Sequence, residues 1–225
     1  VATLGGAAAH LGADGLTDIS LRHPIAVDAP RRIHVVADAD SVSISSSAIT
    51  DDDTSRRVRH VTARPVSSTP PGLRPGLNSD NGSRPIDTAD LVAMTPTSST
   101  ADLLAEWGVQ GQPFAWEVSR VARSTGRMLA DIGLPEPSPA AMLDAAAHVA
   151  RLVDDSTRDL MVPARIDSVL LPITLRGTRA VLDIRRVVSD DADLVVDIVG
   201  STEDADDALL VRGLRFTLVD AEPGV

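Results

Sequence analysis

The stretch SPAAMLDAAAHVARLV at residues 138–153 is the strongest helix signal in this sequence, and it decides the fold class. Ser138 suits the N-cap position, because its hydroxyl can accept a hydrogen bond from a free backbone N–H. Pro139 follows at the first helical position, where its fixed φ angle and missing N–H are harmless. Apolar residues then recur at helical spacing and form one stripe along the helix, which consists of Met142, Ala146, Val149 and Val153. We expect this helix to lie against a sheet.

Strand patterns flank the helix on both sides. Alternating apolar and polar residues predict antiparallel strands with one solvated face. In the second half of the chain these strands lie at residues 115–123, 127–134, 164–175, 179–188, 193–200 and 208–219. In the first half, a weak Ala-rich helix at residues 1–11 precedes strand candidates at 17–27, 32–37, 41–49 and 56–66. Each half is therefore predicted as a helix followed by about four meandering strands, which is an α+β pattern.

The two halves are separated by a segment rich in Pro, Ser and Gly. Six prolines fall between residues 65 and 100, and no periodic pattern continues through them. A connection of this length is unusual inside one compact unit, which favours two subdomains. We predict a first subdomain at residues 1–66, a linker at 67–99 and a second subdomain at 100–225, which opens with a short helix at 100–107.

Composition and charge exclude several classes of function. The net charge is −11, which argues against a basic surface for nucleic acid. The chain has no Cys, so disulfides, thiolate metal sites and a Cys nucleophile are excluded. It also has no Lys, which excludes a phosphate-loop lysine and a Schiff base. No apolar run reaches the roughly 20 residues that a membrane helix needs.

Motifs for metals and nucleotides are also missing from the sequence. The five His are scattered, with no pair at the spacing of metal ligands. The acidic runs at residues 51–53 and 190–193 lack the glycine and terminal glutamate of a calcium loop, so we interpret them as solvated turns. No Gly-rich phosphate loop follows a predicted strand. We therefore expect no metal and no cofactor. We also expect Trp107, Phe114 and Trp116 in the core, and His60 at a surface or a strand edge.

Three short segments carry more specific patterns: GVQGQPF (108–114), SPAAMLDAAAH (138–148) and VPARIDSVLL (162–171). In that order, they resemble a Gly-Tyr-x-Tyr-Gly-Pro-x-Phe turn, a His-Pro-x-x-Leu-Asp-x-x-x-Gln/His helix and a Pro-containing strand. These are motifs of the dehydratase domains of modular type I polyketide synthases. DISLRHPIAV (18–27) and RRVRHVTARPV (56–66) resemble strands of the same domains more weakly.

The resemblance implies a double hot-dog fold, in which each of two helices is wrapped by a curved antiparallel sheet. The first hot dog would be incomplete, because the chain begins inside its helix without the strands that precede the second helix. The family removes water from a β-hydroxyacyl chain, carried on the phosphopantetheine of an acyl carrier protein, and leaves an enoyl chain. The implied partners are the carrier protein, neighbouring synthase domains and a second copy of the domain. The implied location is the cytoplasm, and neither a membrane nor a nucleic acid is an implied partner.

The same resemblance implies the site residues. Asp144 matches the family's Asp, which protonates the leaving hydroxyl, and His148 matches the Gln or His that orients this Asp. His148 lies one helical turn from Asp144 on the same face of the helix. From the residues alone, the alternative to a catalytic pair is an ordinary surface pair at i,i+4 spacing. The residues implied to line the substrate tunnel are Gln110, Gly111, Pro113, Phe114, Ser138 and Pro139.

The family's general base has no match in this sequence. That base lies in a His-x-x-x-Gly-x-x-x-x-Pro motif, which is absent here. Two other positions also differ from the family. Ser138 stands where the helix motif begins with His, and Gln110 stands where the turn motif has Tyr. An acid without its base catalyses elimination poorly, so we expect an impaired or inactive copy. The first residue, Val1, also indicates a piece of a longer polypeptide that could carry the missing strands. Whether the chain is an enzyme stays open, with a non-catalytic docking domain of a synthase module, or a stand-alone hot-dog thioesterase or hydratase, as alternatives.

Overall fold

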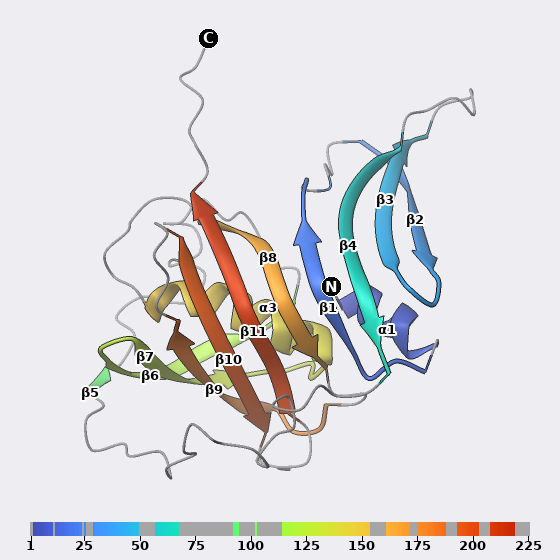
Figure 1. The fold of residues 1–225 in the computed structure, drawn as a ribbon. Coiled ribbons are helices and arrows are strands. Elements are labelled where there is room, and N and C mark those ends of the chain that lie inside the picture. The colour runs from blue at the N-terminus through green and yellow to red at the C-terminus, as the bar shows by residue number, and fades with distance from the viewer. Residues whose placement is uncertain are drawn as a thin grey trace.

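The structure is a computed structural model, and it describes residues 2–10, 12–23, 25, 29–49, 57–67, 92–94, 102, 114–153, 161–171, 175–187, 193–202 and 208–218. In these ranges the chain forms an 11-stranded sheet in the order β2-β3-β4-β1-β8-β11-β10-β9-β7-β6-β5. Figure 1 shows this sheet with one helix against each of its two parts.

The first half of the chain forms one helix and a curved group of strands. Its elements are α1 (Ala2–Ala9), β1 (Gly15–Leu21), β2 (Arg31–Ala37), β3 (Val42–Ala48) and β4 (Val58–Val66). Each lies within, or within two residues of, a range predicted from the sequence. Helix α1 contacts all of these strands, and the inward side chains Leu16, Ile19, Val42 and Ile44 are buried.

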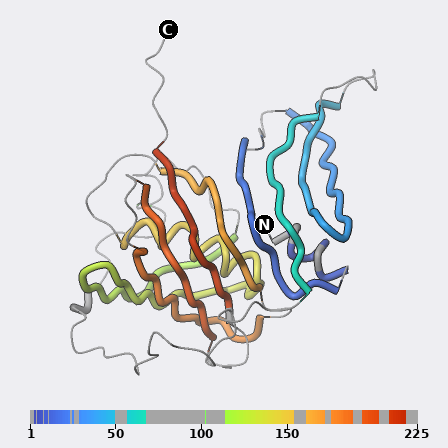
Figure 2. Tube along the Cα trace, in the orientation of Figure 1, coloured from blue at the N-terminus to red at the C-terminus, as the bar shows by residue number. Residues whose placement is uncertain are grey.

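The second half repeats this arrangement around a longer helix. Its elements are β5 (Val92–Met94), β6 (Glu117–Ser124), β7 (Arg127–Gly133), α3 (Pro139–Val149), the short 3-10 helix η2 (Ala150–Val153), β8 (Met161–Leu170), β9 (Arg179–Arg186), β10 (Leu194–Thr202) and β11 (Ala208–Leu218). Helix α3 contacts β10 and β11, as Figure 2 shows along the Cα trace. The predicted stripe is confirmed, because Met142, Ala146 and Val149 are buried and Val153 packs against the core.

Close approach between α3 and the sheet depends on a small residue. A Cβ atom built on Gly200 of β10 would lie 2.5 Å from Cε of Met142 and 3.1 Å from Cδ2 of Leu182. A side chain at this position would therefore force the flexible ends of Met142 and Leu182 to shift, whereas glycine leaves room for Met142 of the helix against the sheet.

The two halves are joined through the first strand that follows each helix, β1 after α1 and β8 after α3. β1 pairs with β8 in antiparallel fashion, from Gly15 opposite Leu170 to Ser20 opposite Arg165. The order β2-β3-β4-β1 in one half matches the order β9-β10-β11-β8 in the other. This is the double hot-dog arrangement expected from the sequence. The prediction of a meander through all four strands of each half is wrong, however. In a meander the first strand would pair with the second, but β1 pairs with β4 and β8 pairs with β11, and β1 and β8 also pair with each other.

Among the described residues, the first hot dog has no counterparts of the strands that extend the second one. In the second half, β9 pairs with β7 and the sheet continues through β6 to β5. The counterpart of β9 is β2, whose one neighbour among the described strands is β3. Three apolar side chains of β2 are exposed: Ile33, Val35 and Val36. The incomplete first hot dog therefore ends in an apolar edge.

The segment predicted as a linker contains a strand. β5 pairs with β6, with Val92 opposite Arg123 and Met94 opposite Val121. Three residues are too few to show a strand periodicity, so the sequence could not have revealed it. Apart from 92–94 and residue 102, residues 68–113 lie outside the described part of the chain, and with them most of the linker and the short helix predicted at 100–107.

Candidate functional site

Helix α3 begins as its sequence predicts. Ser138 has extended backbone angles, and its Oγ accepts a hydrogen bond of 3.1 Å from the backbone N–H of Ala141. Pro139 is the first helical residue. The hydroxyl of Ser138 is thus used to cap the helix, which satisfies one of the N–H groups that have no partner within a helix.

Asp144 lies on α3 with its carboxylate against the indole of Trp116. The Nε1–H of Trp116 donates to Oδ2 of Asp144 over 2.8 Å. Trp116 is 2% exposed, and the side chain of Asp144 is 16% exposed. The carboxylate is therefore held by a core residue instead of extending into bulk solvent. The core position of Trp116 is confirmed, but that of Phe114 is wrong, because Phe114 is 38% exposed; Trp107 lies outside the described residues. The hydrogen bond between Trp116 and Asp144 was not expected from the sequence.

His148 lies beside the same carboxylate. Its Nδ1 lies 2.8 Å from the backbone oxygen of Asp144 and 3.6 Å from Oδ1 of the Asp144 side chain. Because a carbonyl oxygen only accepts, Nδ1 carries the hydrogen in this bond, and the lone pair of a neutral ring is on Nε2. The rings of His148 and Trp116 are 5.8 Å apart at an angle of 37°. We call Trp116, Asp144 and His148 the Asp144 cluster.

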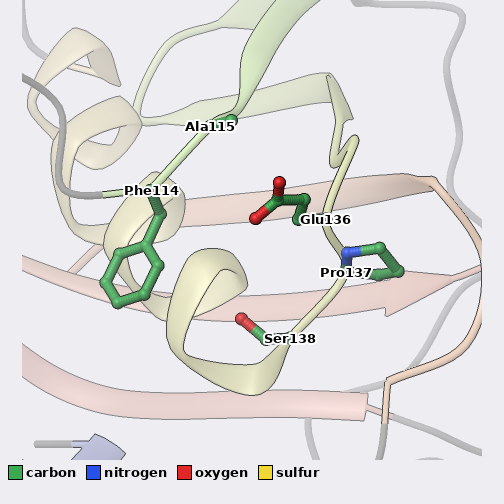
Figure 3. A pocket seen from close by; sticks show the side chains of 5 residues that line it. All are labelled: Phe114, Ala115, Glu136, Pro137 and Ser138. Carbon is green, nitrogen blue, oxygen red and sulfur yellow. The ribbon is translucent and has the colours of Figure 1, made fainter.

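A pocket opens at the start of the same helix. Its cavity volume is about 310 Å³, and it is lined by Phe114, Ala115, Glu136, Pro137 and Ser138. In Figure 3, Phe114 and Pro137 lie on opposite sides of the group, with the carboxylate of Glu136 between them. No motif singled out Glu136, which the sequence analysis therefore missed.

The pocket contains part of the predicted tunnel set. Phe114 and Ser138 line it, while Pro139, on the first turn of α3, and Asp144 are not among its lining residues. The other three residues predicted for the tunnel, which are Gln110, Gly111 and Pro113, lie outside the described residues. Phe114 and Trp116 are two residues apart, so one short segment before β6 supplies both a pocket wall and the partner of Asp144.

The prediction for His60 is wrong, because its side chain is 4% exposed. Adjacent residues of a strand point to opposite faces of the sheet, and on β4 His60 is buried whereas Arg59 is exposed. The Nδ1 of His60 lies 2.9 Å from the backbone oxygen of His23, and its Nε2 lies 2.7 Å from Oγ of Ser46. Both ring nitrogens are engaged, which leaves neither available to act as a base.

The remaining histidines of the first half are placed differently. His10 and His23 are exposed. His34 lies on the edge strand β2, where its Nε2 is 3.2 Å from Oγ of Ser47. Within the described residues, no three side chains of His, Asp or Glu are grouped so that they could hold a metal ion. No helix in that part of the chain is long and apolar enough to span a membrane.

The chain is similar to known proteins over most of its length. No protein-family model matches the chain. The chain is 33% identical over 226 residues to a subunit of the phenolphthiocerol/phthiocerol polyketide synthase of Mycobacterium tuberculosis. The match covers 97% of this chain and 12% of that relative, so the chain spans about an eighth of the relative's length.

Solved structures share the fold. The dehydratase domain from the CurJ module of the curacin polyketide synthase matches 97% of this chain and 80% of its own length, with a TM-score of 0.66 and 14% identity. The bifunctional dehydratase-cyclase domain in ambruticin biosynthesis matches 97% of this chain and 79% of its own length, with a TM-score of 0.69 and 18% identity. The chain is therefore similar to part of a polyketide synthase, and it shares its fold with solved dehydratase domains.

Proposed function

We propose that this domain receives a β-hydroxyacyl chain on the phosphopantetheine of an acyl carrier protein, and that Asp144 is the acid for loss of water. The observation that supports the proposal most is the partly buried carboxylate of Asp144, held by the indole N–H of Trp116. An acid in a fixed position can give its proton to the departing β-hydroxyl, which makes water the leaving group. The reaction is an acid–base elimination, so we propose that it requires no cofactor.

We also propose that the chain as given performs this elimination poorly. The reaction needs a base that removes the α-proton while the acid protonates the hydroxyl. His60 has both ring nitrogens in hydrogen bonds, and His10 and His23 are exposed. The missing base also favours the second candidate, a non-catalytic docking domain that binds the carrier protein without turnover.

The expected partners follow from the same assignment. We propose binding to the carrier protein and to neighbouring domains of a cytoplasmic synthase, and pairing with a second copy of this domain. The exposed apolar side chains at the β2 edge offer a surface for that pairing, because an open strand edge has free backbone groups for a partner strand. We propose no role for nucleic acid or for a membrane.

The test is a dehydration assay on a β-hydroxyacyl pantetheine thioester, with the enoyl product followed by absorbance and mass spectrometry. The chain is expected to turn over slowly, and added imidazole is expected to raise the rate because it supplies a base from solution. Asp144→Asn should remove both the residual and the rescued rate, because the amide cannot donate an acidic proton. A rate that Asp144→Asn leaves unchanged would show that Asp144 is not the acid.

The same assay separates the alternatives. Binding of the carrier protein without product, with or without imidazole, would support the docking domain. Release of free pantetheine and a hydroxy acid would instead indicate a thioesterase. Addition of water to an enoyl thioester, with no preference for the carrier-bound substrate, would indicate a stand-alone hydratase.

A further inference from the structure

We propose that Trp116 is a positioning residue that reserves one oxygen of Asp144, so that the other oxygen delivers the proton to the leaving hydroxyl. This inference rests on the proposed dehydration. Trp116 does not touch the reacting atoms in this scheme; it acts through the carboxyl group of Asp144.

The geometry distinguishes the two carboxylate oxygens. Oδ2 accepts the indole N–H of Trp116 over 2.8 Å. The indole N–H is a donor only, and Trp116 is 2% exposed, so packing in the core fixes the direction of this bond. In a protonated carboxyl the carbonyl oxygen is the stronger acceptor, so the bond from Trp116 favours Oδ2 as the carbonyl and leaves the acidic hydrogen on Oδ1.

His148 leaves Oδ1 available to a substrate. Its Nδ1–H is directed to the backbone oxygen of Asp144, at 2.8 Å. The distance from Nδ1 to Oδ1 is 3.6 Å, which is longer than a hydrogen bond. His148 therefore borders the acidic oxygen without consuming its hydrogen-bonding capacity.

The proton transfer balances in atoms and charge. The hydrogen moves from Oδ1 to the β-hydroxyl oxygen, and the C–O bond breaks with its electron pair leaving on water. The electron pair of the α C–H bond forms the C=C bond, and the α-proton goes to a general base. Asp144 ends as a carboxylate, and the fixed N–H of Trp116 stabilises the charge that develops on it.

A purely structural role is the alternative, in which Trp116 only fills space in the core. The two roles separate when the N–H is removed and an aromatic ring is kept, as in Trp116→Phe. A matched control on the following strand is Ser119→Ala, which removes the bond from Ser119 Oγ–H to the backbone oxygen of Asp131 and leaves the Asp144 cluster untouched.

The first experiment needs no turnover. The chain has two Trp, so a ¹H–¹⁵N spectrum shows two indole signals, and Trp116→Phe identifies that of Trp116. We expect this signal far downfield in the wild type, moved upfield in Asp144→Ala, and unchanged in Ser119→Ala. An indole signal that keeps its position in Asp144→Ala would overturn the inference, because the N–H would then not be bound to the carboxylate.

The second experiment uses the dehydration assay, with imidazole present. Trp116→Phe is expected to lower kcat about ten-fold to a hundred-fold with little change in KM, because a small misplacement of a catalytic group is costly in rate alone. Ser119→Ala should match the wild type. The inference would be overturned if the Trp116→Phe protein is folded, as judged by circular dichroism, and still has the kcat of the wild type. If the wild type shows no turnover at all, the proposed function fails, and the indole spectrum alone decides whether Trp116 holds the carboxyl group.

Discussion

The imidazole of His60 on β4 lies 2.7 Å from the hydroxyl of Ser46 on β3, and both side chains are buried. The other ring nitrogen of His60 donates to the backbone oxygen of His23, so the ring connects two strands and the chain beyond β1. A carbonyl only accepts, which makes the remaining nitrogen the acceptor of the Ser46 hydroxyl in a neutral ring. The first half of the sheet thus holds its buried histidine in a structural role.

Replacing this ring should destabilise the fold. His60→Leu leaves the buried hydroxyl of Ser46 and the oxygen of His23 without their partner, at a cost of about 2–3 kcal/mol in the free energy of unfolding. Urea denaturation followed by circular dichroism measures it. His34→Leu is the matched control: it removes one hydrogen bond, from a ring on the edge strand β2 to Ser47 on β3, and should cost less than His60→Leu, which removes two. Equal losses in the two variants would contradict the buried network.

The cap of α3 gives a second prediction. Ser138→Ala should lower the free energy of unfolding by about 1 kcal/mol, because the N–H of Ala141 loses its acceptor. Ser138→Asp should retain most of the stability, since its carboxylate can accept the same bond at a helix N-terminus. Chemical denaturation of the three proteins measures the effect. An alanine variant as stable as the wild type would show that the cap does not stabilise the start of the helix.

Gly213 on β11 should resist substitution for two reasons. Its φ angle is +58°, and a Cβ atom there would collide with the side chain of Asp167. Gly177 also has a positive φ, of +85°, but has open space around it. Gly177→Ala measures backbone strain alone, at about 1 kcal/mol, and Gly213→Ala should cost at least about 1 kcal/mol more. Thermal unfolding of both variants tests this, and a Gly213→Ala protein no less stable than Gly177→Ala would contradict the collision.

Stability should depend on pH through Asp183. Burial opposes its ionisation, but hydrogen bonds from Arg127 and Arg185 outweigh burial and hold the pKa of Asp183 below its ordinary value. A carboxyl group whose pKa is lowered in the folded state binds fewer protons in the folded chain than in the unfolded chain. Its contribution to stability is therefore fully present above the unfolded-state pKa of about 3.9, and it is lost as the pH falls through the folded-state pKa. The free energy of unfolding should therefore fall below about pH 4, and fall less steeply in Asp183→Asn.

A control for this pH dependence is Asp131→Asn. Asp131 pairs with Arg120, whose side chain is 68% exposed, so solvent screens that pair strongly. Denaturant unfolding at several pH values gives the slope of the unfolding free energy against pH. This slope should change less in Asp131→Asn than in Asp183→Asn. If Asp183→Asn retains the full wild-type slope, the pairing of Asp183 with Arg127 and Arg185 is not its source.

The apolar edge at β2 predicts self-association. We expect the mass measured by light scattering to increase with protein concentration, and Val35→Lys, which places a charge on the β2 edge, should reduce that increase. Val181→Lys is the control, since Val181 is also exposed but lies on β9, which is paired on both sides. A mass that is the same in all three proteins at every concentration would exclude the β2 edge as a self-association surface.

Much of the fold was predictable from local patterns. The alternation in β1 to β4 and in β8 to β11 located the main strands to within a few residues, because a half-buried strand buries every second side chain. The spacing of Met142, Ala146 and Val149 located the buried face of α3. β5 was missed because it is short, and His60 was misplaced because the groups its ring contacts, Ser46 on β3 and the backbone oxygen of His23, are far from it in sequence.

The sequence alone determined the elements, the cap at Ser138 and the place of Asp144 on a helix, since each depends on neighbours within a turn or two of chain. Only the tertiary structure decided what Asp144 contacts. Its partner Trp116 is 28 residues away in sequence, and the two meet because β6, β7 and the packing of α3 on the sheet bring them together. The same holds for the pairing of β1 with β8, which joins the two halves. Such contacts depend on how elements far apart in the chain pack, which no local pattern encodes.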